Sequence, residues 1–280
     1  EAVPAAGGDM APAVGGGVMP AVDGDVVPGV SGEALPGLDG DVVSALGGDA
    51  VGVLHPGHRA EDDYRRLESL LGGTVRLPLA RTGGRPEPAR AEALRELGSA
   101  ARLSAAVAEL RRQGVRAVLW AGTSAGFAFG WEGAHAQVRE VAAAAGLPAS
   151  STSFAFVHAL RELGATRVAV ASGCPGEVAG HITDFLKAAG AEVVSVHRAT
   201  EASTPVRGRA ELLRLVGAAD HRRAQAVLLP DTSPLTARWL GDLEAALGKP
   251  VLTASQVTVW EGLRLLDRHP RRPGLGALFD

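Results

Sequence analysis

Apolar runs alternate with amphipathic stretches from about residue 50 to the C-terminus. Several runs are apolar throughout, such as "AVLW", "RVAVAS" and "AVLLP". Strands that are buried on both faces have this pattern, and the helices that connect parallel strands bury them. We expect strands at 50–55, 74–80, 116–121, 167–172, 192–197, 225–230 and 250–253. We expect helices at 59–71, 87–113 (broken near Gly98), 132–145, 152–163, 176–189, 206–218, 234–247 and 256–267. The pattern predicts an α/β chain with doubly wound parallel sheets.

The first part of the chain has a different pattern. Residues 7–54 repeat every eight residues, in units such as GGDMAPAV, DGDVVPGV and GGDAVGVL. Glycine and proline at this density disfavour both helix and strand, and one or two aliphatic residues per unit bury too little surface to offset the entropy of ordering. We therefore expect residues 1–47 to form a flexible or loosely packed extension, and the sixth unit to continue into the first strand.

Composition excludes several classes of protein. A net charge of -3 and 4% aromatic residues argue against a nucleic-acid surface. The single cysteine, Cys174, rules out an intrachain disulfide and a C-x-x-C metal site. We find no cluster with metal-ligand spacing and no nucleotide-binding loop, so we expect no metal and no cofactor. No apolar run is long enough to span a membrane and no basic leader is present, so we expect a cytoplasmic protein.

Small polar residues follow nearly every predicted strand. Ligands of doubly wound sheets bind beyond the carboxyl ends of the strands, where helix N-termini point at them, although each such turn is also an ordinary helix cap. The turns are His55-Pro56-Gly57-His58, Gly122-Thr123-Ser124, Ser172-Gly173-Cys174-Pro175, Asp231-Thr232-Ser233 and Thr253-Ala254-Ser255-Gln256. Their repetition at five strand ends favours a binding site at this edge.

Five ordered segments carry a resemblance to a known group of enzymes. They are "VGVLHPG", "VLWAGTSAGF", "LPASSTSFAFVHALRELGATRVAVASGCPGEV", "AVLLPDTSPLT" and "LGKPVLTASQVTVWEGLRLL". Together they resemble the aspartate/glutamate racemase superfamily, nearest its branch of maleate isomerases and arylmalonate decarboxylases. The resemblance implies two similar Rossmann-like lobes related by a pseudo-twofold axis, with the active site in the cleft between them. It places the lobes at 48–153 and 154–254, with a C-terminal helix within 255–280 that returns to the first lobe.

The same resemblance implies the chemistry. In the superfamily two cysteines face each other across the substrate, and arylmalonate decarboxylases have glycine at the first of these positions. Here the first position is Gly122 and the second is Asp231, so both thiols are absent, while Cys174 stands where the family has tyrosine. The implied activity is that of a cofactor-independent lyase or isomerase acting on a small carboxylate or dicarboxylate through an enediolate-type intermediate. Decarboxylation fits better than racemisation, because a racemase needs an acid and a base on opposite faces.

The candidate site residues follow from these turns. We expect catalytic roles for Asp231, Cys174 and Ser124. Burial in an apolar cleft would raise the pKa of Asp231 into the range of a general acid, and a helix N-terminus would stabilise a thiolate at Cys174. We expect substrate contacts from His55, Pro56, Gly122, Thr123, Ser124, Thr232, Ser233, Ser255 and Gln256. The plain alternatives are caps or turn formers at the hydroxyl and carboxylate positions and a small buried hydrophobe at Cys174.

Two other functions stay open. The loss of both cysteines also fits a non-catalytic carboxylate-binding homologue. Residues 122–126 satisfy G-x-S-x-G, and Asp231 and His269 follow Ser124 in the chain order of a serine hydrolase triad, although "DRHPRRPG" around His269 is typical of a surface tail. As partners we expect a small carboxylate, with no nucleic acid and no membrane, and we leave a homodimer open.

Overall fold

The computed structural model describes residues 48–57, 61–83, 91–173, 176–198, 208–230 and 236–280, and the structural statements below concern these residues. The predicted extension 1–47 lies outside them. So do Cys174, Asp231, Thr232 and Ser233.

The first sheet is parallel and has β1 at its centre. It contains β1 (Asp49–His55), β2 (Val75–Arg76), β3 (Leu79–Arg81), β4 (Ala117–Trp120) and β5 (Ala149–Ser151). Its order is β2-β1-β4-β5, and β3 also pairs with β1. The predicted strand 74–80 is therefore two short pieces, β2 and β3, on the same side of β1. Pro78 lies between them and lacks the N–H group that a continuous ladder needs.

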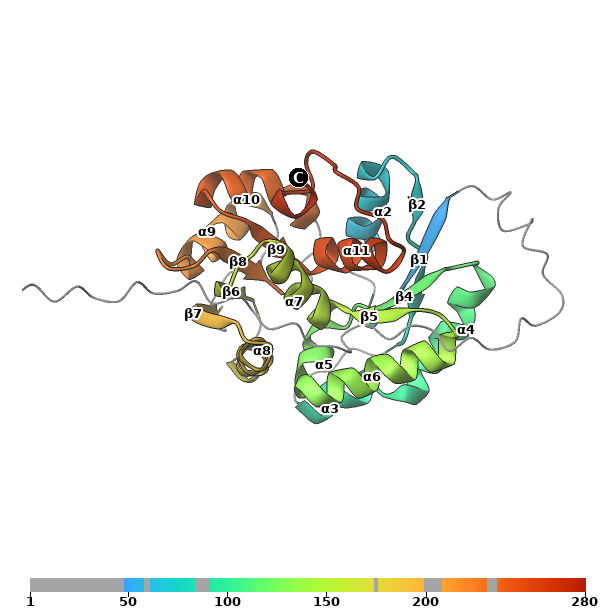
Figure 1. The fold of residues 1–280 in the computed structure, drawn as a ribbon. Coiled ribbons are helices and arrows are strands. Elements are labelled where there is room, and N and C mark those ends of the chain that lie inside the picture. The colour runs from blue at the N-terminus through green and yellow to red at the C-terminus, as the bar shows by residue number, and fades with distance from the viewer. Residues whose placement is uncertain (1–47, 58–60, 84–90, 174–175, 199–207, 231–235) are drawn as a thin grey trace, which may run out of the picture.

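The second sheet repeats this connectivity. It contains β6 (Arg167–Ser172), β7 (Glu192–Arg198), β8 (Ala226–Leu229) and β9 (Val251–Thr253), in the order β7-β6-β8-β9 with every pair parallel. If β2 and β3 count as one strand, both sheets have the order second, first, third, fourth. Figure 1 shows the two sheets on opposite sides of the molecule. The predicted α/β class with parallel sheets is confirmed.

Helices connect the strands and cover the sheets. They are α2 (Glu61–Leu70), α3 (Ala91–Leu97), α4 (Ala100–Arg112), α5 (Thr123–Ala128), α6 (Gly130–Ala145), α7 (Thr152–Glu162), α8 (Gly176–Ala188), α9 (Arg209–Ala219), α10 (Leu240–Leu247) and α11 (Ala254–Leu265), with short 3-10 turns η1 (Thr236–Arg238) and η2 (Ala277–Phe279). The expected break near Gly98 is present. The helix expected from residue 234 begins only at Leu240. Within the described residues, no helix has the length and apolar character that crossing a membrane requires.

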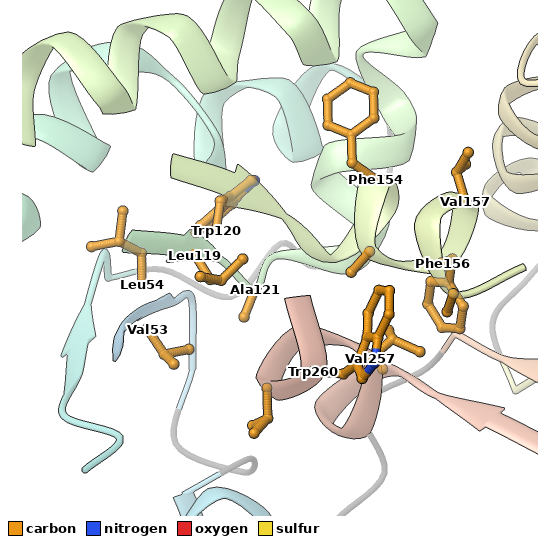
Figure 2. Packing of buried hydrophobic residues seen from close by; sticks show 14 of the residues in the cluster. Val53, Leu54, Leu119, Trp120, Ala121, Phe154, Phe156, Val157, Val257 and Trp260 are labelled. Carbon is orange, nitrogen blue, oxygen red and sulfur yellow. The ribbon is translucent and has the colours of Figure 1, made fainter. Parts of the chain in front are cut away.

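The last helix packs against the first sheet although it follows the second. α11 contacts β1, β4 and α2, and its most extensive helix contact is with α7. Gly262 permits this approach, since a Cβ there would lie 2.4 Å from Cγ1 of Val51. In Figure 2, Leu54 and Trp120 point to one face of the first sheet, whereas Val53 and Leu119 point to the face where α11 lies. The division into lobes at 48–153 and 154–254 stays a proposal.

One hydrophobic cluster extends through both sheets. It includes Val53 and Leu119 from the first sheet, Val170 and Leu228 from the second, and Val257 from α11, all at 0% exposure. A second, smaller cluster lies on the other face of the second sheet, beneath α9 and α10. The two sheets therefore share one hydrophobic core.

Candidate active site

The carboxyl ends of β1 and β4 lie side by side. Leu54 pairs with Trp120 in the parallel register, and the Ala121 N–H donates to the Leu54 carbonyl at 2.8 Å. On the other side of β1, the Thr82 N–H donates to the His55 carbonyl at 3.1 Å. Neighbouring strands are about 4.8 Å apart, so the backbones of His55 and Ala121 are adjacent. The sheet thus brings His55 next to the turn that begins at Gly122.

The hydroxyl turn starts α5. Gly122 is its N-cap, and the Gly122 carbonyl accepts from the Gly126 N–H at 2.7 Å. Thr123 is 6% exposed, and its Oγ1 has no hydrogen-bond partner among the described residues. Ser124 is half-buried. A buried hydroxyl without a partner costs about 1–3 kcal/mol, which a bound carboxylate oxygen would recover.

Gly122 is required by its neighbour Trp120. A Cβ built on Gly122 would lie 2.0 Å from Cζ2 of the indole and 2.5 Å from Cε2 and Cη2. Trp120 is 1% exposed and cannot swing into solvent. A cysteine, or any other side chain, therefore does not fit at residue 122 while the indole occupies this space.

Gly126 is also a packing glycine. A Cβ there would lie 2.5 Å from Oγ of Ser153, the second residue of α7. The Ser153 side chain is 1% exposed, and its hydroxyl has no partner in the described part of the chain. Both glycines of the G-x-S-x-G pattern thus serve close contacts and do not shape a nucleophile elbow.

The serine hydrolase alternative is wrong for two reasons. A nucleophile elbow holds its serine on a sharp, strained turn. Ser124 instead lies in the first turn of α5, and Asp267 is the only non-glycine residue with positive φ in the described chain. His269 lines a surface cavity with Asp49 and Arg116 at the amino ends of β1 and β4. That is the opposite end of the sheet from Ser124, roughly 20 Å away along the seven residues of β1.

His55 is buried at the centre of the carboxyl edge. Its side chain is 4% exposed, and Tyr64 packs edge-on with ring centroids 6.5 Å apart. Nδ1 lies 2.8 Å from the Gly57 carbonyl and 3.0 Å from the Gly57 N. Burial lowers the pKa of His55, and this outweighs Gly57 and Glu61, which raise it. The imidazole is therefore neutral at neutral pH. Pro56, the next residue, is half-buried at the same edge.

Ser255 and Gln256 are already engaged within the fold. Gln256 is 0% exposed; its Nε2 donates to the Leu275 carbonyl at 2.6 Å, and its Oε1 accepts from the Thr253 N–H at 3.1 Å. This is the capping box of α11, so the substrate contact expected from Gln256 is corrected to a structural role. Ser255 Oγ donates to Asp63 Oδ2 at 2.7 Å, which likewise gives Ser255 a place in a buried cluster.

Asp63 is the centre of that cluster, and sequence reasoning missed it. Its Oδ2 also accepts from Thr236 Oγ1 at 2.8 Å, and Asp63, Thr236 and Ser255 are each 2% exposed. The three residues come from α2, η1 and α11. An acidic residue in the first turn of a helix is ordinarily a solvated partner of the dipole. The available signal was its spacing, because Asp63 is four residues before Leu67 and so shares the buried face of α2.

A buried ion pair joins α7 to α11. Glu261 is 0% exposed; its Oε1 is 3.0 Å from His158 Nδ1, and its Oε2 is 2.8 Å from Arg264 Nε. Burial by itself raises the pKa of Glu261, but His158 and then Arg264 outweigh it and hold the pKa at about 2. His158, which the sequence presents as an ordinary helix residue, is part of this cluster.

Comparison with known proteins identifies a family and several similar structures. Residues 98–279 match the arylmalonate decarboxylase family. Arylmalonate decarboxylase from Bordetella bronchiseptica is 29% identical over 177 residues, which cover 61% of this chain and 74% of that protein. A crystal structure of arylmalonate decarboxylase is similar with a TM-score of 0.68 and 25% identity, covering 82% of this chain and 99% of the other.

A cysteine-to-alanine variant of the maleate isomerase Iso from Pseudomonas putida S16, solved with maleate, has a similar fold. Its TM-score is 0.74 at 19% identity, and the match covers 82% of this chain and 97% of that structure. The branch of the superfamily inferred from the sequence is confirmed, and the chain belongs to the arylmalonate decarboxylase family.

Proposed function

We propose that the protein is a cofactor-independent decarboxylase of a small malonate-type dicarboxylate. The observation that carries the proposal is the pairing of Gly122 with Trp120 beside the buried hydroxyl of Thr123, which has no partner among the residues that the structure describes. This edge of the first sheet has groups that suit a carboxylate and has no room for a thiol at residue 122. Membership of the arylmalonate decarboxylase family supports the same reaction class.

The proposed reaction has two steps. Cleavage of the bond between Cα and one carboxylate releases CO₂ and leaves the electron pair on an enediolate. A proton delivered to Cα then gives the monocarboxylate. Negative charge moves onto the retained carboxylate during the first step, so donors at Thr123, at Ser124 and in the backbone of the first turn of α5 bind the enediolate more strongly than the ground state.

Proton delivery is proposed to come from one face. Because residue 122 has no side chain, the donor must belong to another segment, and Asp231 is our first candidate and Cys174 our second. Contacts from Thr232, Ser233 and Pro56 are part of the same proposal. A single donor face accounts for decarboxylation with protonation on one side, and it disfavours racemisation.

The decisive assay measures CO₂ release from phenylmalonate by the purified chain without added cofactor, with conversion of maleate to fumarate as the isomerase control. Turnover of phenylmalonate supports the proposal, and turnover of maleate alone assigns the chain to isomerisation. Binding of phenylmalonate without turnover of either compound overturns the proposal in favour of the carboxylate-binding homologue.

Two variants test the assigned roles. Thr123→Val should lower kcat by about 10²–10³-fold through loss of one oxyanion donor. Thr183→Val is a matched control, because the Thr183 hydroxyl donates to the Ala179 carbonyl within its own helix, α8. Asp231→Asn should lower kcat with little change in binding, since the amide keeps the shape but delivers no proton. Full activity of both Thr123→Val and Asp231→Asn would remove the proposed site.

A further inference from the structure

Within the described part of the chain, one ring nitrogen of His55 has hydrogen-bond partners and the other has none. Nδ1 is held by the backbone of Gly57, two residues further along the chain. Nε2 is buried and makes no hydrogen bond within the described structure. The side chain is 4% exposed, so water does not replace the missing partner at the surface. Buried polar groups without partners are rare and require an explanation.

The position of His55 in the sheet explains why Nε2 is buried without a partner in the described structure. It is the last residue of β1, between β3 and β4, and therefore at the middle of the carboxyl edge of the first sheet. Ligands of doubly wound sheets bind at this edge. The adjacent strand continues through Ala121 directly into Gly122 and Thr123, whose Oγ1 is likewise buried and unpartnered in the described chain. Among the described residues, two polar groups without partners thus lie at the same edge, one at the end of β1 and one at the start of the helix that follows β4.

The ring is held in a defined orientation. Gly57 fits both tautomers of the ring, because its carbonyl is 2.8 Å from Nδ1 and its N–H is 3.0 Å from Nδ1. In the tautomer in which the Gly57 N–H donates to Nδ1, the ring proton is on Nε2. Tyr64 contacts the ring edge-on from α2 and limits its rotation. A carboxylate at Nε2 selects this tautomer, since the other one would present a lone pair to it. In the selected tautomer the neutral imidazole is a hydrogen-bond donor to an oxyanion.

We propose that His55 is a catalytic residue whose Nε2–H donates to a carboxylate oxygen of the substrate. The inference rests on the proposed function, since it assigns a second donor to the same carboxylate site. Thr123 and His55 then bind the substrate from two adjacent strand ends. Both donors gain strength as charge develops on the enediolate.

Asparagine and glutamine separate the two ring nitrogens. The amide of His55→Asn reaches about as far as Nδ1, so it keeps the link to Gly57 and removes the donor at Nε2. The amide of His55→Gln reaches about as far as Nε2 and restores a donor there. His221 is a matched control, because its Nδ1 accepts from the N–H two residues ahead, Arg223, at 3.2 Å in a more exposed setting.

The measurements are kcat/KM on phenylmalonate, the Kd of malonate by calorimetry, and thermal stability. We expect His55→Asn to keep its melting temperature, to lose about 10²-fold or more in kcat/KM and to bind malonate at least tenfold more weakly. His55→Gln should recover at least tenfold of the lost kcat/KM, and the His221 variants should match the wild type. The inference is overturned if His55→Asn binds malonate as tightly as the wild type does. It is also overturned if the variants lose kcat/KM only in proportion to their loss of thermal stability.

The two proposals fail in different ways. If the wild type binds malonate without turnover and His55→Asn weakens that binding, the decarboxylase proposal is lost and the His55 contact stands. If the wild type is active and both His55 variants keep its kcat/KM, the decarboxylase proposal stands and the His55 contact is lost.

Discussion

The contact between Gly122 and Trp120 makes a quantitative prediction. In Gly122→Ala the new methyl group would start 2.0 Å from Cζ2 of an indole that is 1% exposed. Real Cβ contacts are never this short, so either the ring or the start of α5 has to move. Overpacking a filled core costs about 1–3 kcal/mol, and for a chain of this size each kcal/mol lowers the melting temperature by about 2–4 °C. We therefore expect Gly122→Ala to melt about 2–12 °C below the wild type.

A control and a double-mutant cycle isolate the cause. Gly217 in α9 has open space around its would-be Cβ, so Gly217→Ala should be neutral or stabilising by up to about 1 kcal/mol. Trp120→Phe removes the ring atoms nearest to residue 122. The loss in Gly122→Ala/Trp120→Phe should then be smaller than the sum of the single losses by at least about 1 kcal/mol.

Urea denaturation followed by far-UV circular dichroism measures all four variants, because tryptophan fluorescence changes with Trp120 itself. The reasoning is refuted if Gly122→Ala is as stable as Gly217→Ala, or if the losses in the cycle are additive. The same pair of positions also tests whether a cysteine fits at residue 122. Gly122→Cys should give a poorly folded protein with Trp120 present and a folded one with Phe at that position, as judged by thiol titration of the soluble fraction.

Three further predictions concern other parts of the structure. Asp63→Ala leaves the buried hydroxyls of Thr236 and Ser255 without their acceptor, so the free energy of unfolding in urea should fall by about 2–4 kcal/mol; a loss below 1 kcal/mol would contradict the cluster. The pKa of Glu261 is lowered from 4.5 to about 2, so its stabilisation is present above pH 4.5 and is lost as the pH falls towards 2; stability measured against pH should show this decline in the wild type and not in Glu261→Gln. Dialysis against EDTA should leave turnover unchanged, since no group of three or more candidate ligands occurs in the described chain; activity lost and then restored by a divalent ion would overturn this.

Much of the fold follows from the hydrophobic pattern. β4, β6 and β8 are buried at nearly every position, and strands of this kind read as continuous apolar runs. β5 was missed because it has three residues, two of them Ser150 and Ser151, which are buried although they are polar. α5 was missed because glycine at 122, 126 and 130 suppresses a helix prediction. In both places the tertiary contacts outweigh the local signal.

The site was predictable as a turn but not in its details. Small polar residues after an apolar strand indicated the carboxyl edge, and the structure places the end of β1, at His55, beside the end of β4, which the Thr123 turn follows. The sequence could not show that Gly122 is fixed by the orientation of an indole two residues earlier. It did contain the signal for Gln256, because Thr253 and Gln256 have the T-x-x-Q spacing of a capping box, and spacing alone favoured a structural role.

The buried cluster around Asp63 links the first sheet to segments that follow strands of the second sheet. Thr236 directly follows the segment 231–235, which contains our candidate acid. Its hydrogen-bond partner Asp63 belongs to α2, beside the first sheet. Ser255, at the start of α11, binds the same carboxylate oxygen. A carboxylate near the first sheet therefore fixes residues that follow β8 and β9 of the second. Because the candidate acid Asp231 precedes Thr236 by five residues in the sequence, we expect proton delivery to depend on this cluster. We then expect Asp63→Asn, which keeps a hydrogen-bonding group of the same shape, to lower kcat on phenylmalonate by a larger factor than any fall in its folded fraction explains.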